Sequence, residues 1–228
     1  MGFKELDKVL AAMVSAFGER VELVELPGGE YSSMRYPKFP PIMRFTVKRY
    51  AAGGFGNVFS MHTRAMGGMM RLMTLVFTPN LGANVPLLLV DVMAMGKKRA
   101  AFVEYYDLTT NGADCPALHD IAAKYKHLPD YPEKPAWYVG ERTLYSLIKG
   151  GEDDEALVSM LMESVSAYAK ACASASRDGA NLAGLCAFVE RMVREGNPSA
   201  ATMEKVLGRE GAERFFRTAT MPVNYTEA

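Results

Sequence analysis

Four strand-like segments follow one another in the middle of the chain, and this run constrains the fold more than any other feature. Each segment is rich in apolar, β-branched or aromatic residues, and the connections between them are short; they are residues 58–66, 69–77, 85–95 and 99–108. The turn Gly96-Lys97-Lys98 between the last two is typical of a tight hairpin. Successive strands with short connections pair antiparallel, because a parallel pair needs a long crossover. The sequence therefore predicts a central antiparallel sheet.

Further elements are expected on both sides of this run. Met43, Phe45 and Val47 alternate with polar residues, as in a half-buried strand. Shorter strands are expected over residues 21–26 and 31–36. Apolar residues recur at helical spacing over residues 3–17, and from Pro116 onward the chain is mainly helical. Helices that precede and follow a sheet can cover both of its faces. We therefore predict an α+β fold, a three-layer α/β/α sandwich with a central antiparallel sheet, in which residues 1–228 form a single domain.

The composition excludes several classes of protein. The 228 residues carry 26 basic and 26 acidic side chains, so no global charge indicates nucleic-acid or membrane binding. No apolar run approaches the roughly 20 residues that span a bilayer. The three cysteines stand singly, without the pair spacing of a metal or redox site, and fit reduced thiols. Strand follows the glycine cluster 53–56, so it is not a phosphate-binding loop. We expect a cytoplasmic monomer without a bound metal.

Asp91 is the residue that most strongly suggests chemistry. No Asp or Glu occurs from Tyr31 to Val90, although seven Lys and Arg residues do, and Asp91 then follows inside the apolar run 85–93. Burial disfavours an ionised carboxylate, so the pKa of Asp91 should rise. A protonated acid beside a basic surface suggests a site that protonates an anionic substrate. The structural alternative is an Asp at the edge of the sheet, bonded to a neighbouring Arg.

Two groups of segments resemble a known family. The first group surrounds Asp91, and the second lies near the C-terminus; they are Leu75–Pro79, Val85–Val92 and Ala100–Leu108, and then Glu195–Pro198, Met203–Gly208 and Ala212–Phe216. In their order and spacing they resemble the ferredoxin-dependent bilin reductases, and together they cover about a third of the chain. The red chlorophyll catabolite reductases share this fold, so the resemblance leaves the subfamily open.

The resemblance implies a function for Asp91. The proline spacing is intact, so Asp91 matches the family's Asp that points into the tetrapyrrole pocket and donates a proton. The family reduces linear tetrapyrroles such as biliverdin, with single electrons from reduced ferredoxin and through radical intermediates. It needs no bound metal or flavin. An acidic ferredoxin is therefore the expected partner, and a linear tetrapyrrole is the expected substrate.

The sequence also departs from the family's pattern. Asn197 stands where many members carry a second Asp, and it also reads as a helix cap. Thr74 falls where members place a His or Asn on the strand that faces Asp91. His62 is a candidate replacement for that partner, although a single His on a strand is usually a hydrogen-bonded structural residue. With Asp91 as the one clear acid, protonation at a single position is favoured over a four-electron reduction.

The remaining predicted site residues would hold the substrate. Arg64 and Arg71 are expected to pair with propionate groups, because a guanidinium binds carboxylates with two hydrogen bonds. Met73, Leu89 and Phe102 are expected to form apolar walls of the pocket, together with Thr74.

Two alternatives remain open at the sequence level. One is a tetrapyrrole-binding or carrier protein that kept the pocket and lost the second acid. The other is a reductase of a chlorophyll-type catabolite.

Overall fold

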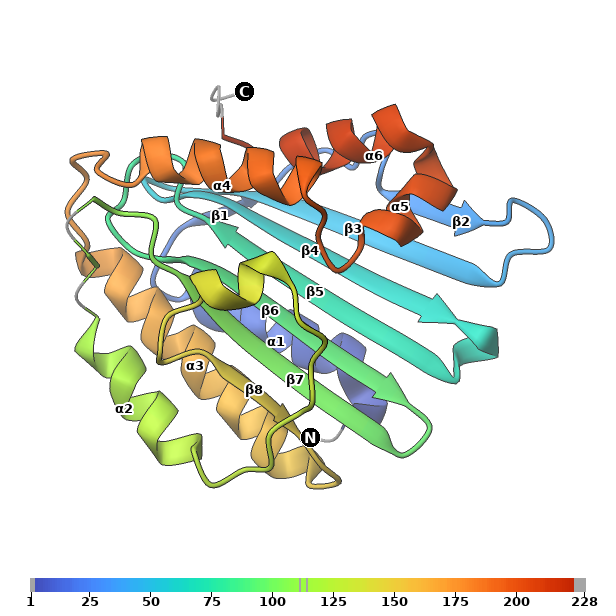
Figure 1. The fold of residues 1–228 in the computed structure, drawn as a ribbon, viewed down its shortest axis with the longest axis horizontal. Helices are drawn as coiled ribbons and strands as arrows, with labels where there is room; N and C mark the ends of the chain where they lie inside the picture. The colour runs from blue at the N-terminus through green and yellow to red at the C-terminus, as the bar shows by residue number, and fades with distance from the viewer. Residues whose placement is uncertain (1–2, 111, 114, 224–228) are drawn as a thin grey trace.

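The central feature of the fold is an antiparallel sheet (Figure 1). The computed structural model describes residues 3–110, 112–113 and 115–223. Within these residues the sheet has eight strands in the order β1-β3-β4-β5-β6-β7-β8, and β2 pairs with β3 beside β1. The strands are β1 (Leu23–Glu25), β2 (Ser33–Tyr36), β3 (Met43–Ala52), β4 (Gly56–Ala65), β5 (Met70–Thr78), β6 (Leu87–Met95), β7 (Lys98–Tyr106) and β8 (Leu147–Gly150).

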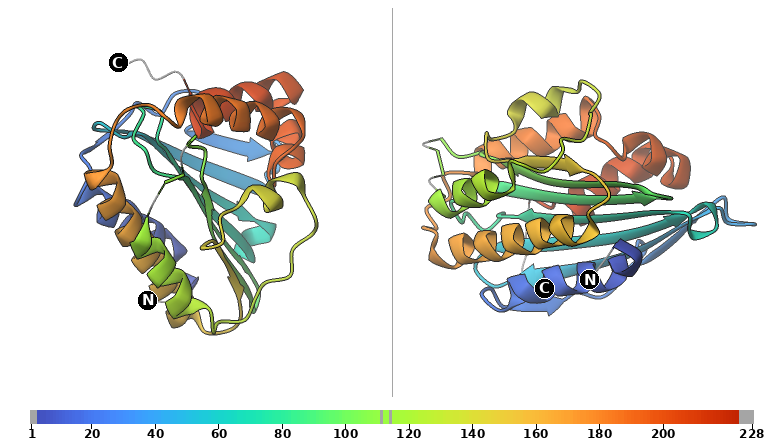
Figure 2. Two further views of the ribbon diagram at one scale, coloured as in Figure 1. Left: turned by 60° about the vertical axis from the view of Figure 1, so that its left-hand side comes forward. Right: turned by 90° about the horizontal axis from the view of Figure 1, so that it is seen from below.

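Helices cover both faces of this sheet (Figure 2). The first face is covered by α1 (Leu6–Gly18), α2 (Pro116–Tyr125) and α3 (Asp154–Ser174). The second face is covered by α4 (Leu182–Arg194), α5 (Ala200–Leu207) and α6 (Arg209–Phe215), together with the segment 131–146. Short helical turns complete the described elements: η1 (Phe3–Glu5), η2 (Met66–Gly68), η3 (Trp137–Glu141) and η4 (Phe216–Thr220). The predicted α+β, three-layer sandwich is confirmed.

Each face of the sheet contributes to its own hydrophobic core. On the first face, Phe77 packs between Phe17 of α1 and Tyr168 of α3, with ring centroids 4.8 and 5.8 Å away. On the second face, Phe59 packs against Phe215 of α6 at 5.7 Å. Successive side chains of a strand point to opposite faces, so neighbours in the sequence enter different cores. This alternation decides which predicted site residues can meet.

The strand β8 lies in a region that its sequence predicts to be mainly helical. It adds four residues to the free edge of β7, where Val103 pairs with Leu147. So short a segment has no periodicity of its own, and pairing with a strand already in place determines its conformation. No helix in the described part of the chain is long and apolar enough to cross a membrane.

Candidate active site

A cavity of about 410 Å³ lies on the second face of the sheet, under the segment 131–142 and the start of α5. A cavity of this size is typical of a small-molecule site. Apolar side chains line most of it, and a few polar groups converge on its floor: Met43, Phe45, Met61, Thr63, Met70, Leu72, Thr74, Asp91, Val92, Met93, Phe102, Glu104, Tyr131, Pro132, Glu133, Lys134, Tyr138, Arg142, Pro198, Ser199, Thr202 and Met203. Asp91, Thr74 and Phe102 are thus brought together in one cavity.

Asp91 and Thr74 face each other across β5 and β6. They are partners in the strand register, and the Thr74 hydroxyl donates a hydrogen bond of 2.5 Å to an Asp91 carboxylate oxygen. Burial raises the pKa of Asp91 to about 6, against the opposing effects of the Thr74 hydrogen bond and the positive charge of Arg142. Asp91 therefore keeps its proton to a higher pH than an exposed Asp does.

Glu104 is a second buried acid on the same floor. Glu104 lies on β7, two residues after Phe102 and on the same face of the sheet, and it is 4% exposed. Its carboxylate contacts the Arg142 guanidinium and accepts a 3.4 Å hydrogen bond from the Tyr106 hydroxyl. Burial raises the pKa of Glu104 to about 8 despite the nearby Arg142, and the charge of Asp91 adds to the rise. At neutral pH Glu104 is therefore mainly protonated.

Arg142 is shared among several carboxyl groups. Besides Glu104, it binds Glu133 with two hydrogen bonds of 2.6 and 2.9 Å, and its positive charge also acts on Asp91. Burial of Asp91 and Glu104 outweighs the positive charge of this guanidinium, so the pKa values of both acids stay raised. This cluster was not predicted from the sequence.

Asn197 and Leu89 line a smaller cavity of about 40 Å³ that adjoins the first and shares Asp91, Thr74 and Glu104 with it. The Asn197 amide donates to the Met192 carbonyl at 3.1 Å, and its oxygen accepts from the Ser199 N–H at 3.0 Å. Asn197 thus lies near Asp91, but its polar atoms hold the connection between α4 and α5. The N-cap position of α5 is occupied by Ser199, so the prediction that Asn197 caps this helix is wrong by two residues.

Phe102 forms part of the cavity wall. It is the register partner of Asp91 on β7, and its ring packs edge-on against Tyr131 at 5.5 Å. Tyr131 belongs to the segment that covers the cavity. The contact therefore ties the floor of the site to its cover.

Four predicted site residues lie on the opposite face of the sheet. Met73 is fully buried in the core beneath α1 and α3. His62 and Arg64 both contact Asp7 of α1, and Arg71 donates a 3.1 Å hydrogen bond to the Lys4 carbonyl. Because side chains alternate along a strand, residues 71 and 73 cannot share a face with Thr74. The expectation that these four residues line the pocket of Asp91 is thus contradicted.

The pKa of His62 also argues against a role as a proton donor. Burial lowers its pKa, and the positive charges of Arg64 and Arg71 act in the same direction, against the raising effect of Asp7. The neutral imidazole is therefore favoured near neutral pH. Its position between the sheet and α1 indicates that it helps to hold this helix.

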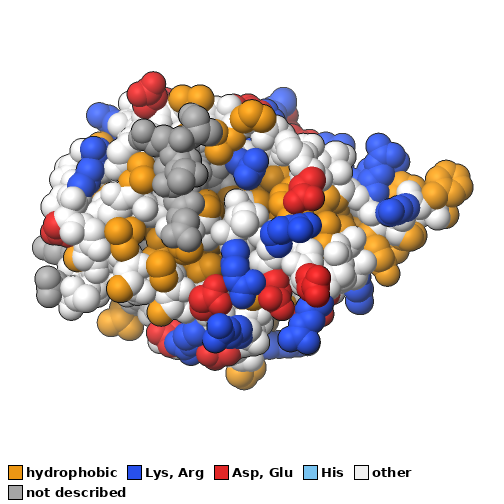
Figure 3. Space-filling view, turned by 90° about the horizontal axis from the view of Figure 1, so that it is seen from above, with side chains coloured by type: hydrophobic (Ala, Val, Ile, Leu, Met, Phe, Trp, Pro, Cys, Tyr) orange, Lys and Arg blue, Asp and Glu red, His pale blue; other side chains and the backbone are white. Residues whose placement is uncertain are grey.

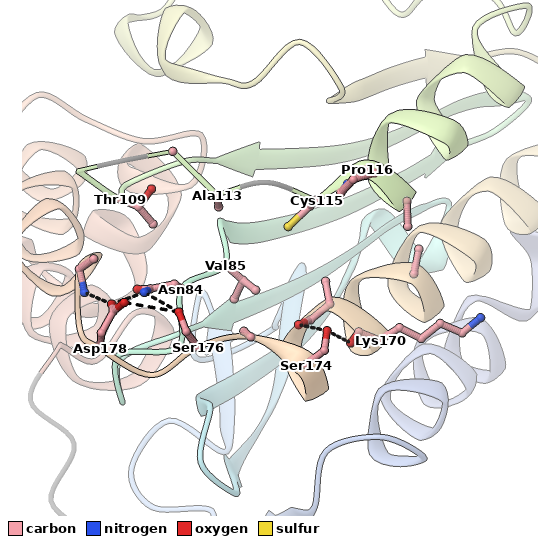
Figure 4. Close-up of a pocket in the computed structure, with 16 residues that line it drawn as sticks. Asn84, Val85, Thr109, Ala113, Cys115, Pro116, Lys170, Ser174, Ser176 and Asp178 are labelled. Atoms are coloured by element: carbon pink, nitrogen blue, oxygen red, sulfur yellow. Dashed lines mark hydrogen bonds between the residues drawn. The ribbon is translucent and has the colours of Figure 1, made fainter.

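A second cavity, of about 530 Å³, lies at the C-terminal end of α3 (Figure 4). The Asn84 amide donates to the Ser176 hydroxyl at 2.9 Å and also contacts Asp178. The hydrogen bond from Asn84 is the main reason that the pKa of Asp178 is lowered. These groups pair with one another and join two loops, and Asp178 holds no proton near neutral pH. The cavity of Asp91 is therefore the better candidate for acid chemistry.

A valine in place of Thr74 is expected to raise the pKa of Asp91 by about one to two units, because a hydrogen bond to a charged group contributes about 1.5–3 kcal/mol. The pKa can be measured by carboxyl ¹³C NMR titration. Thr63→Val is the matched control, since Thr63 lines the same cavity and no hydrogen bond joins it to Asp91. An unchanged pKa in Thr74→Val would show that this hydrogen bond does not stabilise the Asp91 carboxylate.

Comparison with known proteins gives a match in structure. No model of a protein family matches the sequence, and no curated protein shows significant similarity to it. The fold matches 35 chains of solved structures. Among them is phytochromobilin synthase from tomato in complex with biliverdin, with a TM-score of 0.75 over 97% of this chain and 86% of that chain, at 11% sequence identity. The two chains share a fold.

Proposed function

We propose that this protein reduces a linear tetrapyrrole of the biliverdin type, with single electrons from reduced ferredoxin and protons from Asp91 and Glu104. The observation that carries the proposal is the pair of carboxyl groups with raised pKa values on the floor of one largely apolar cavity. The fold shared with a synthase that was solved with biliverdin supports a bilin as the ligand.

The reduction of one double bond consumes two electrons and two protons. Ferredoxin transfers electrons one at a time, so the first electron produces a radical anion, which Asp91 protonates. The second electron and a second proton complete the reduction. Glu104 holds a proton at neutral pH and lies on the same cavity floor, so it is the proposed second donor. Glu104 would thus act as the second proton donor, a role that Asn197 cannot fill because its side chain is an amide.

The cavity also suggests how a bilin is held. Phe102 and the methionines of the wall offer an apolar surface to the flat conjugated system. Among the described residues, Lys134 and Arg142 are the cationic side chains that line this cavity. Arg142 is held by Glu104 and Glu133. Lys134 is exposed at the rim, so it is the proposed partner of a propionate group.

The function can be tested by mixing the purified protein with biliverdin and then adding reduced ferredoxin with a system that regenerates it. We expect the absorbance of the pigment to shift on mixing and to change again as electrons are supplied. A shift without further change would favour a carrier, and reduction of a chlorophyll-type catabolite alone would favour that substrate. If no bilin bound, the proposal would be wrong.

Arg71→Ala is the control for this assay. Arg71 lies on the face of the sheet away from the cavity and donates to the Lys4 carbonyl. We expect this variant to bind and reduce the bilin as the wild type does. A large rise in KM would instead place Arg71 in the substrate site.

A further inference from the structure

Three hairpin tips lie side by side at one end of the sheet, at the right of Figure 1. They are residues 37–42 between β2 and β3, residues 66–69 between β4 and β5, and residues 95–98, from the last residue of β6 to the first residue of β7. The antiparallel register brings them to the same end, since Met43 pairs with Ala65 and Met70 with Met95. These segments are called the hairpin tips below.

The hairpin tips expose apolar side chains to an unusual degree. Phe39 is 89% exposed and Met69 is 65% exposed. Five of the eight large hydrophobic side chains that are exposed in the described part of the chain lie on these tips: Phe39, Ile42, Met66, Met69 and Met95. Lys38, Lys97 and Lys98 lie beside them, and no Asp or Glu occurs in the three segments. Figure 3 shows hydrophobic and basic side chains protruding together at this end.

A row of arginines crosses the sheet next to the hairpin tips. Arg35 pairs with Arg44, Arg44 with Arg64, and Arg64 with Arg71, so four adjacent strands carry an arginine at the same level. Like charges directly opposite each other destabilise a sheet. Asp7 offsets part of this repulsion by pairing with Arg64. Among the described residues, neither Arg35 nor Arg44 forms an ion pair, so an external anion would relieve the repulsion.

We propose that this end of the molecule docks onto the surface of an anionic lipid membrane. The apolar side chains of the hairpin tips would enter the interface between headgroups and acyl chains, and the lysines would lie among the headgroups. The arginine row lies one residue behind the strand ends, at a level where it meets lipid phosphates. No membrane-spanning segment is needed for such a contact, so the absence of long apolar runs does not oppose it.

The charge of the hairpin tips argues against a second copy of the chain as the occupant. A symmetric dimer through this end would place the lysines of one copy against those of the other, and the arginine rows would lie close together. The apolar groups also come from three neighbouring loops at the end of the sheet. Protruding apolar loops with surrounding cations suit a deformable anionic surface.

The candidate active site extends toward the same end. Met43, Met70 and Met93 line the cavity, and they lie within two residues of Ile42, Met69 and Met95. Membrane docking would therefore bring one end of the cavity close to the lipid. A poorly water-soluble ligand could then reach the cavity with little exposure to water.

The proposal can be tested by sedimentation of the protein with vesicles, without pigment or electron donor, so the result is independent of the proposed function. We expect binding to vesicles of phosphatidylcholine mixed with phosphatidylserine. Binding should be weaker at high salt and much weaker to phosphatidylcholine alone. Absence of binding to the anionic vesicles would overturn the proposal.

Two variants separate the apolar and the charged contributions. Phe39→Ser with Met69→Ser is expected to lower the partition coefficient about tenfold or more. Arg35→Gln with Arg44→Gln is expected to lower it about fivefold per arginine on anionic vesicles only. Leu144→Ser is the control, because Leu144 is fully exposed but lies outside the hairpin tips. Circular dichroism checks that each variant is folded.

The outcomes are distinct. Vesicle binding that neither double variant weakens would place the contact elsewhere and overturn the proposal. A dimer in analytical ultracentrifugation that Phe39→Ser with Met69→Ser dissociates, without vesicle binding, would identify a second copy as the occupant.

Discussion

Turnover of a bilin is expected to fall about 100-fold or more when Asp91 is replaced by asparagine, while pigment binding stays within a factor of about three. The amide has nearly the same shape as the carboxyl group, and its oxygen can still accept the hydrogen bond from Thr74. The proton that the radical intermediate needs is lost. Single-turnover absorbance with reduced ferredoxin measures the rate, and electron paramagnetic resonance detects an accumulated radical.

Asp120→Asn is the control for this substitution, because Asp120 is an exposed Asp on α2. A rate like that of the wild type in Asp91→Asn would remove Asp91 from the mechanism. Loss of pigment binding in the same variant would instead make Asp91 a binding residue.

The pH dependence of the wild-type rate should reflect both acids. Asp91 donates only while protonated, and its pKa is about 6; Glu104 holds its proton up to a pKa of about 8. We therefore expect kcat to decline with rising pH between about 6 and 8. Because the two groups interact, the profile reports the apparent pKa values of the pair. A rate that is constant across this range would contradict a role for these carboxyl groups as acids.

Arg142→Leu is expected to destabilise the fold by about 3 kcal/mol at pH 8, because it leaves buried carboxyl groups without their cation. The pKa of Glu104 is raised from 4.5 to about 8, so folding is favoured by its protonation. Its contribution to stability is complete below about pH 4.5 and is lost as the pH rises through 8. Without Arg142 the pKa rises further, so the loss should be larger at pH 8 than at pH 5. Urea unfolding at both values measures it.

Two variants test the origin of this loss. Arg142→Leu combined with Glu104→Gln should recover part of the stability, because both charges are then removed. Arg209→Leu is the surface control; its ion pair with Glu213 is largely exposed, so a change within about 0.5 kcal/mol is expected. Equal destabilisation by the two arginine substitutions would mean that the buried cluster contributes no more to the free energy of unfolding than an exposed ion pair does.

The sequence predicted the layers of the fold because its strands are consecutive and its helices are strongly periodic. The resemblance to the bilin reductases implied that Thr74 faces Asp91, and the structure has a register pair and a hydrogen bond there. Arg71 was predicted to pair with a propionate group and Met73 to line the pocket, but both lie on the other face of the sheet from Thr74. The two-residue period of a strand separates them, and it could have been applied before the structure was known.

The acidic cluster was harder to predict. Glu104 follows Phe102 by two residues in an apolar strand, so the signal that identified Asp91 was also present there. Arg142, however, reaches Glu104 from a connecting segment about forty positions away, and no periodicity marks that contact. Long-range ion pairs depend on how a covering segment packs, which a single sequence does not reveal.

The alternation of the strands also has a consequence for genetic experiments. Along β5, Thr74 faces the proposed catalytic cavity, whereas Arg71 and Met73 face the side of α1. A systematic mutational scan of this strand should therefore give effects that alternate from one position to the next. Even-numbered positions would mainly affect pigment chemistry, and odd-numbered positions would mainly affect folding or surface attachment. Adjacent codons would then be under different selective pressures, so the two faces of the strand can diverge independently during evolution.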